Sequence, residues 1–137
     1  MALNRVYAQQ GKYLPNLLFI AQTAARTSNE PISGDPCVCG ELPGVALENA
    51  DANGRCVVQA DGIFDLLVAG INSSGVSGAD ANVAVNGGDI VYFDQSKTPP
   101  ISKRAGGVPF GRAIGDSGVQ VVASGVTTTK IPVQVGV

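Results

Sequence analysis

The sequence contains no histidine and no tryptophan, and only three of its 137 residues are cysteines. Without histidine, the usual Ser-His-Asp and Cys-His arrangements cannot form, and the commonest general base and metal ligand are also missing. The three cysteines, Cys37, Cys39 and Cys56, are few and odd in number, which argues against a secreted disulfide framework. We therefore expect a protein that is not an enzyme, with no catalytic residue, no cofactor and no metal site.

Charged residues are also scarce. They make up 15% of the chain, with nine Lys and Arg against eleven Asp and Glu and a net charge of −2. Nucleic-acid binding usually needs a dense basic stripe that neutralises phosphates, whereas here Lys103 and Arg104 are the nearest approach to a cluster. No apolar run reaches the roughly 18 residues that span a bilayer. Leu14–Ala25 resembles a secretion signal only faintly, because proline and polar residues interrupt it. We expect neither a nucleic-acid nor a membrane partner.

Glycine and short apolar runs dominate what remains. The chain has 18 glycines and 8 prolines, and 45% of its residues are hydrophobic. Valine-rich runs interrupted by Gly, Asn and Asp are typical of short strands joined by tight turns. The apolar content is too high for a disordered chain. These proportions predict an all-β protein with a glycine-rich fold.

The chain divides into two unequal parts, residues 1–33 and residues 34–137. The first part contains Tyr7, Tyr13 and the apolar run Leu17–Ile20, with a spacing that fits neither a helix nor a strand. One interpretation is an extended N-terminal arm that contacts a partner outside its own domain. The other is a first strand and loop that pack on the same core. The sequence leaves both open.

The second part contains strand-like runs separated by turn signals. These runs are 36–39, 45–47, 55–60, 63–68, 89–93, 108–114 and 127–135. Seven short strands predict a small β-barrel or sandwich over residues 34–137. Pro109 and Pro132 cannot donate ladder hydrogen bonds, so they should lie at edges or bulges. The small, polar segment Ala69–Asn86 is expected to be a long loop.

The polar and sulfur-containing side chains have ordinary interpretations. Cys37 and Cys39 would share one strand face and pack as small buried hydrophobes, although a metal site or a redox pair remains open. A C-x-C spacing differs from the C-x-x-C of zinc ribbons. Lys103, Arg104 and Arg112 are expected at a solvated edge, with contact to an acidic partner as the alternative.

Five motifs occur in an order that resembles the capsid cement, or head decoration, proteins of tailed bacteriophages. The first is Gly34–Gly40 (GDPCVCG) with Leu42–Leu47 (LPGVAL), and the others are Gly54–Phe64, Gly88–Asp94 (GDIVYFD), Phe110–Ile114 (FGRAI) and Lys130–Val135. The sequence departs from this pattern in three places. Cysteines replace the usual valines at 37 and 39, the loop 69–86 is long, and the segment 12–33 is expanded.

The resemblance implies a structural virion protein of the capsid outer surface, made in the cytoplasm of a host bacterium. Such proteins bind the assembled lattice of the major capsid protein and cement neighbouring capsid subunits, often as homotrimers. The alternative is a host- or glycan-binding β module displayed on a virion or cell surface, with the 69–86 loop carrying the binding.

Two sets of residues are singled out by these arguments. The capsid or protomer interface is expected at Tyr7, Tyr13, Leu17, Leu18 and Phe19, because aromatic and large apolar side chains are typical interface anchors. The fold-determining turns are expected at Gly34, Asp35, Gly62, Gly88, Asp89 and Gly111. Glycine adopts positive φ at low cost, and an aspartate at a strand start can accept hydrogen bonds from local backbone amides.

Overall fold

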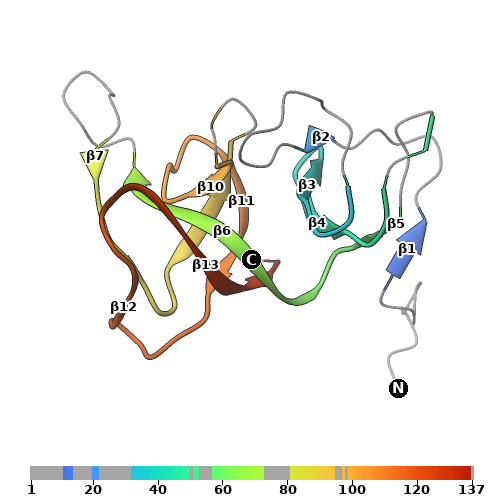
Figure 1. The fold of residues 1–137 in the computed structure, drawn as a ribbon. Coiled ribbons are helices and arrows are strands. Elements are labelled where there is room, and N and C mark those ends of the chain that lie inside the picture. The colour runs from blue at the N-terminus through green and yellow to red at the C-terminus, as the bar shows by residue number, and fades with distance from the viewer. Residues whose placement is uncertain are drawn as a thin grey trace.

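The computed structural model describes residues 11–13, 20–21, 32–49, 51–52, 57–72, 81–94, 97 and 99–136. These residues form thirteen β-strands and no helix (Figure 1). The all-β prediction is therefore confirmed. The strands fall into a closed barrel, a second sheet beside it and a short two-stranded sheet.

The barrel contains five strands. They are β6 (Gly62–Asn72), β9 (Ile90–Phe93), β10 (Ile101–Ser102), β11 (Val108–Ala113) and β13 (Gly125–Val135). Their order is β10-β9-β11-β13-β6, and β10 also pairs with β6, which closes the barrel. The closing pair is parallel, with Ile101 opposite Val68 and Ser102 opposite Ala69. The prediction of a small barrel is confirmed by this closure.

The barrel is filled by alternate residues of its strands, as the two-residue period of a strand requires. In β9, Val91 and Phe93 are buried, while Ile90 and Tyr92 are half-buried. The rings of Phe93 and Phe110 stack with their centroids 6.2 Å apart. The buried barrel core includes Leu66, Val68, Val91, Phe93, Ile101, Phe110, Ala113, Ile131, Val133 and Val135.

The second sheet lies to one side of the barrel, and β6 runs from near it into the barrel (Figure 1). Its strands are β1 (Gly11–Tyr13), β2 (Ile20–Ala21), β3 (Pro36–Cys39), β4 (Leu42–Ala46) and β5 (Val57–Gln59), in the order β1-β5-β4-β3-β2. Val38 and Val45 belong to the same buried cluster as the barrel residues. One face of the second sheet therefore packs against the barrel.

The first part of the chain contributes two strands to this sheet. β1 pairs with β5, placing Tyr13 opposite Val57, and β2 pairs with β3, placing Ala21 opposite Cys37. Ile32 and Ser33 are also described, and the other residues of the expected arm lie outside the described part of the chain. Residues on both sides of position 33 join one sheet. The division of the chain at residue 33 stays a prediction.

The expected loop Ala69–Asn86 was wrong in part. β6 continues to Asn72, with Ala69 and Ile71 buried, and β7 (Ala81–Asn82) pairs with its end. β8 (Val85–Asn86) pairs with β12 (Gln120–Val122). Glycine is required at position 70 because backbones approach closely there: a Cβ at Gly70 would overlap the carbonyl oxygen of Ala123. Residues 73–80 lie outside the described ranges.

The two strand prolines behave differently. Pro109 lies where the register between β11 and β9 shifts before Gly111, which is the expected bulge. Pro132 lies inside β13 opposite Asp65, so the expectation of an edge or bulge was wrong there. The pairing of β13 with β11 covers Val133–Val135, so Pro132 lies just beyond it.

Candidate functional site

Two turns of the same design precede β3 and β9. In the first, Gly34 has a φ of 90°, and in the second Gly88 has a φ of 91°. Positive φ at the third position of a four-residue turn is the type II geometry, which favours glycine. The following aspartate accepts a hydrogen bond in each case: Ile32 N–H donates to Asp35 Oδ2 at 2.9 Å. Asn86 N–H donates to the carboxylate oxygen of the second turn at 2.9 Å.

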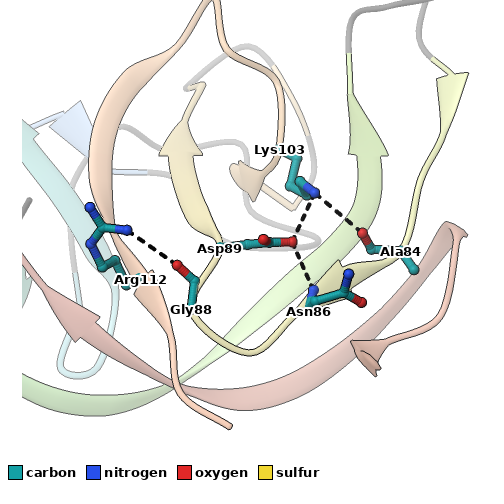
Figure 2. Close-up of polar contacts among 6 residues, drawn as sticks. All are labelled: Ala84, Asn86, Gly88, Asp89, Lys103 and Arg112. Atoms are coloured by element: carbon teal, nitrogen blue, oxygen red, sulfur yellow. Dashed lines mark hydrogen bonds and ion pairs between the residues drawn. The ribbon is translucent and has the colours of Figure 1, made fainter. Parts of the chain in front are cut away.

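The Asp89 carboxylate is also the acceptor of the most developed polar cluster in the described part of the chain (Figure 2). Lys103 Nζ lies 2.8 Å from Asp89 Oδ2 and 3.5 Å from the carbonyl oxygen of Ala84. Burial of the carboxylate would by itself raise its pKa. Hydrogen bonds from Lys103 and the Asn86 amide, with the charge of Lys103, instead hold the pKa of Asp89 below its usual value. This ion pair joins the start of β9 to the end of β10.

The other basic side chains near this cluster have partners too. Arg112 Nη1 donates to the carbonyl oxygen of Gly88 at 3.2 Å, across the turn (Figure 2). Arg104 is only 6% exposed and its Nη1 lies 3.4 Å from Ser102 Oγ. The expectation that all three basic residues lie at a solvated edge was therefore wrong for Arg104. Lys103 and Arg112 fix local backbone and side-chain positions.

The two other predicted glycines have different surroundings. Gly62, at the start of β6, has a φ of 103°. Gly111 has no positive φ, but a Cβ there would overlap the carbonyl oxygen of Gln134 on β13. Glycine is therefore required at position 111 because β11 and β13 approach closely there. The sequence alone could not distinguish these two reasons for glycine.

A shallow cleft of about 240 Å³ lies where the second sheet meets the barrel. Its walls come from the first Gly-Asp turn, the middle of β6, the segment before β10 and Lys130 of β13. It is lined by Ser33, Gly34, Asp35, Pro36, Asp65, Leu66, Leu67, Pro99, Pro100 and Lys130. The sequence did not predict this cleft, because its walls come from four separate segments.

The outer face of the β6–β13 pair carries exposed apolar side chains. Ile63 is 59% exposed and Leu67 is 37% exposed, and both point away from the barrel core. Their partners across the pair are Gln134 and Lys130. Val119, before β12, is 54% exposed. On the β6–β13 face the exposed Asp65 lies between Ile63 and Leu67, so the apolar side chains alternate with single polar and charged groups.

Most of the interface residues expected from the sequence lie in parts of the chain that the structure does not describe. Tyr7, Leu17, Leu18 and Phe19 lie outside the described residues, and Tyr13 is placed by its backbone at the end of β1. β1 ends at Tyr13 and β2 begins at Ile20, so the three apolar residues lie between two paired strands in the sequence. Their expected contact with the capsid stays a prediction.

Reactive groups are not gathered in the residues that the structure describes. Cys37 is fully buried and its thiol lies 3.6 Å from the carbonyl oxygen of Gly44. Within these residues there is no group of three or more His, Cys, Asp and Glu that could hold a metal ion. Nor does this part of the chain contain a helix long and apolar enough to cross a membrane. The described residues offer turns, a shallow cleft and exposed side chains, and no gathered reactive groups.

Comparison with known proteins gives one match. The family model described as phage cement protein matches residues 20–126, which is well over half of the chain. The match covers both Gly-Asp turns, all of the second sheet except β1, and most of the barrel. No curated protein and no solved structure matches this chain. The chain therefore belongs to the phage cement protein family.

Proposed function

We propose that this protein binds the outer surface of the assembled major capsid lattice and cements neighbouring capsid subunits, acting as a homotrimer. The observation that carries the proposal is the family match over residues 20–126, since that family has a structural role in the phage capsid. The fold is compatible with this role. A closed barrel leaves no free edge among its own strands, so contacts with partners fall to loops and outer faces.

The proposed capsid contact is made by the first part of the chain. In the sequence, residues 14–19 lie between β1, which pairs with β5, and β2, which pairs with β3. Leu17, Leu18 and Phe19 lie in this segment, and Tyr7 and Tyr13 precede it. Burying these side chains against the capsid would contribute about 25 cal/mol per Å² of apolar surface.

Trimerisation would increase the stabilising effect. After one protomer of a trimer binds, the others meet their sites at a high effective concentration, so modest individual contacts add to a strong attachment. A protein that binds only the mature lattice stabilises that lattice by mass action. This is how a small module can cement a shell through binding contacts.

The first experiment measures binding to capsids. Purified protein is mixed with expanded shells and with unexpanded shells of the same phage, and the bound fraction is measured by sedimentation. We expect binding to expanded shells, and a loss of at least about tenfold in affinity for Leu17→Ser/Leu18→Ser/Phe19→Ser. The matched control is Val119→Ser, which changes an exposed apolar residue outside the proposed contact.

Two results would contradict the proposal. The proposed docking segment is wrong if the triple variant binds as tightly as the parent chain. The cement role is wrong if neither kind of shell retains the protein. The trimer is tested separately by light scattering, with an expected mass three times the 13.9 kDa of one chain.

A further inference from the structure

The two Gly-Asp turns agree beyond their glycines. Asp35 N–H donates to the carbonyl oxygen of Ile32 at 2.9 Å, and Asp89 N–H donates to that of Asn86 at 3.1 Å. In each turn the aspartate carboxylate accepts the N–H of the first residue at 2.9 Å. The two turns therefore have the same hydrogen bonds in the same direction.

Each turn is tied in the same way to an alanine of the next sheet strand. Gly34 N–H donates to the Ala46 carbonyl at 2.7 Å, and Ala46 N–H donates to the Asp35 carbonyl at 2.9 Å. In the barrel, the Ala113 carbonyl accepts from the turn glycine at 2.8 Å. The Ala113 N–H donates to the backbone carbonyl oxygen of Asp89 at 2.9 Å. The pairing of β4 with β3 is therefore equivalent to the pairing of β11 with β9.

The correspondence continues into a third strand. Leu47 N–H donates to the Val57 carbonyl at 2.9 Å, and Ile114 N–H donates to the Pro132 carbonyl at 3.0 Å. The sheet pairs agree in register. Val45 faces Gln59 and Ala46 faces Val58 in the second sheet, while the barrel pairs Arg112 with Gln134 and Ala113 with Val133. Gly44 of β4 and Gly111 of β11 are also equivalent. A Cβ atom at either position would lie close to a backbone carbonyl oxygen of the paired strand, that of Gln59 or of Gln134.

The flanking strands also take equivalent places. β1 pairs antiparallel with β5 as β6 does with β13, and β2 pairs antiparallel with β3 as β10 does with β9. The β1 register matches as well: Lys12 faces Val58, and the corresponding barrel pair is Phe64 with Val133. The strands of the second sheet, in the order β1-β5-β4-β3-β2, therefore correspond one by one to the barrel strands β6-β13-β11-β9-β10.

We propose that the second sheet and the barrel are two copies of one strand unit, residues 32–59 and 86–134, each flanked by two further strands. The interior positions agree: Cys37, Ala46 and Val58 are at most 2% exposed, as are Val91, Ala113 and Val133. The residues identical at equivalent positions are Gly34 and Gly88, Asp35 and Asp89, Pro43 and Pro109, Gly44 and Gly111, Ala46 and Ala113, Val58 and Val133, Gln59 and Gln134.

The proposal assigns a role to the strands at the start of the chain. β1 and β2 take the places of the barrel's closing strands β6 and β10 in the strand order. We infer that they cover a second core, formed by the buried Cys37, Ala46 and Val58. Residues 11–13 and 20–21 are then part of the fold, and a capsid contact is left to the segment between them. This inference stands on the hydrogen bonds and registers, whatever the partner of the protein is.

The first test uses amide hydrogen exchange on the unsubstituted full chain, followed by NMR. We expect the amides of Ala46 and Leu47 to be protected at least about 100-fold, and the amides of their equivalents Ala113 and Ile114 to be protected as well. Exchange of Ala46 and Leu47 at the rate of an unstructured chain, beside protected Ala113 and Ile114, would overturn the proposal.

The second test uses the thiol of Cys37 in a chain carrying Cys39→Ala and Cys56→Ala. Adjacent strand residues direct their N–H groups to opposite edges, so Lys12→Pro/Tyr13→Pro removes whichever one faces β5. We expect at least about tenfold faster reaction with a disulfide reagent, because the second core opens locally. Lys12→Ala/Tyr13→Ala is the matched control, and in this variant the Cys37 thiol should react as slowly as in the parent chain.

Two outcomes of the thiol test count against the proposal. One is an unchanged rate in the proline variant, and the other is a thiol that already reacts freely in the parent chain. If the proline variant has lost its whole fold, its Ala113 amide is no longer protected. The exchange measurement on the unsubstituted chain then decides.

Discussion

Replacing Gly111 with alanine should destabilise the barrel through one contact. The added Cβ would overlap the carbonyl oxygen of Gln134 and lie 3.0 Å from its carbonyl carbon and 3.2 Å from the Cα of Val135. All three atoms are backbone atoms of β13, which is paired on both sides, so the clash cannot be relieved by a side-chain rotation. The strands must separate, which places the cost at about 3 kcal/mol on the scale of overpacked cores.

The matched control is Gly106→Ala. Gly106 has no positive φ and nothing within 4 Å of its Cβ position, so alanine there should change stability by less than about 0.5 kcal/mol. For a chain of this length, an unfolding entropy of about 2.1 cal/mol/K per residue makes 1 kcal/mol equivalent to about 3 to 4 °C. Thermal unfolding followed by circular dichroism should therefore show Gly111→Ala melting about 10 °C below the control. Equal melting temperatures would refute the close approach of β11 and β13.

The remaining predictions concern the turn, the ion pair and the core. Gly88→Ala should lower stability by about 1 to 2 kcal/mol in denaturant unfolding, because its Cβ meets open space but φ is 91°. Because the pKa of Asp89 is lowered in the fold, its stabilising contribution is present above the unfolded pKa and is lost as the pH falls through the folded pKa. Asp89→Asn should therefore flatten the acid side of the stability curve, and Lys103→Met should flatten it partly. With the partners about a quarter exposed, the effect should be about 1 kcal/mol, and an unchanged curve would contradict it. Phe110→Ala should cost about 3 to 5 kcal/mol, whereas Val119→Ala should change little; equal effects would contradict the packing described.

Local signals predicted the strands well where they were strong. The run Pro36–Cys39 is a strand with the predicted bounds, because a Gly-Asp turn precedes it and a glycine follows it. β9 begins one residue later than predicted, since Asp89 completes the turn with its carboxylate. Barrel and sandwich could not be distinguished, because closure depends on β10. That strand has two residues and pairs in parallel with a distant part of the chain.

Small residues misled the sequence reading of β6. Ala69 and Gly70 resemble loop residues, yet both are buried, and at Gly70 the backbone of Ala123 leaves no room for a side chain. Arg104 was also misread, since burial of a charged side chain is unusual and is set by tertiary context. The pairing of Asp89 with Lys103 joins residues fourteen positions apart, so no local pattern could indicate it.

The internal repeat is hidden in the sequence by a change of spacing. In the second sheet, the short turn at Gly40 and Glu41 joins β3 directly to β4. In the barrel, the chain between β9 and β11 first forms β10, and the bulge before Gly111 shifts the register again. Equivalent residues are therefore separated by different numbers of positions, and only the hydrogen bonds reveal the match.

The central claim is attachment to the outside of an assembled capsid, and electron cryo-microscopy of decorated shells tests it most directly. Expanded shells incubated with the purified protein should show added density on their outer surface, in sets of three, at the junctions between neighbouring major capsid subunits. Shells with bare outer surfaces at saturating protein, or added density confined to the inner surface, would contradict the account.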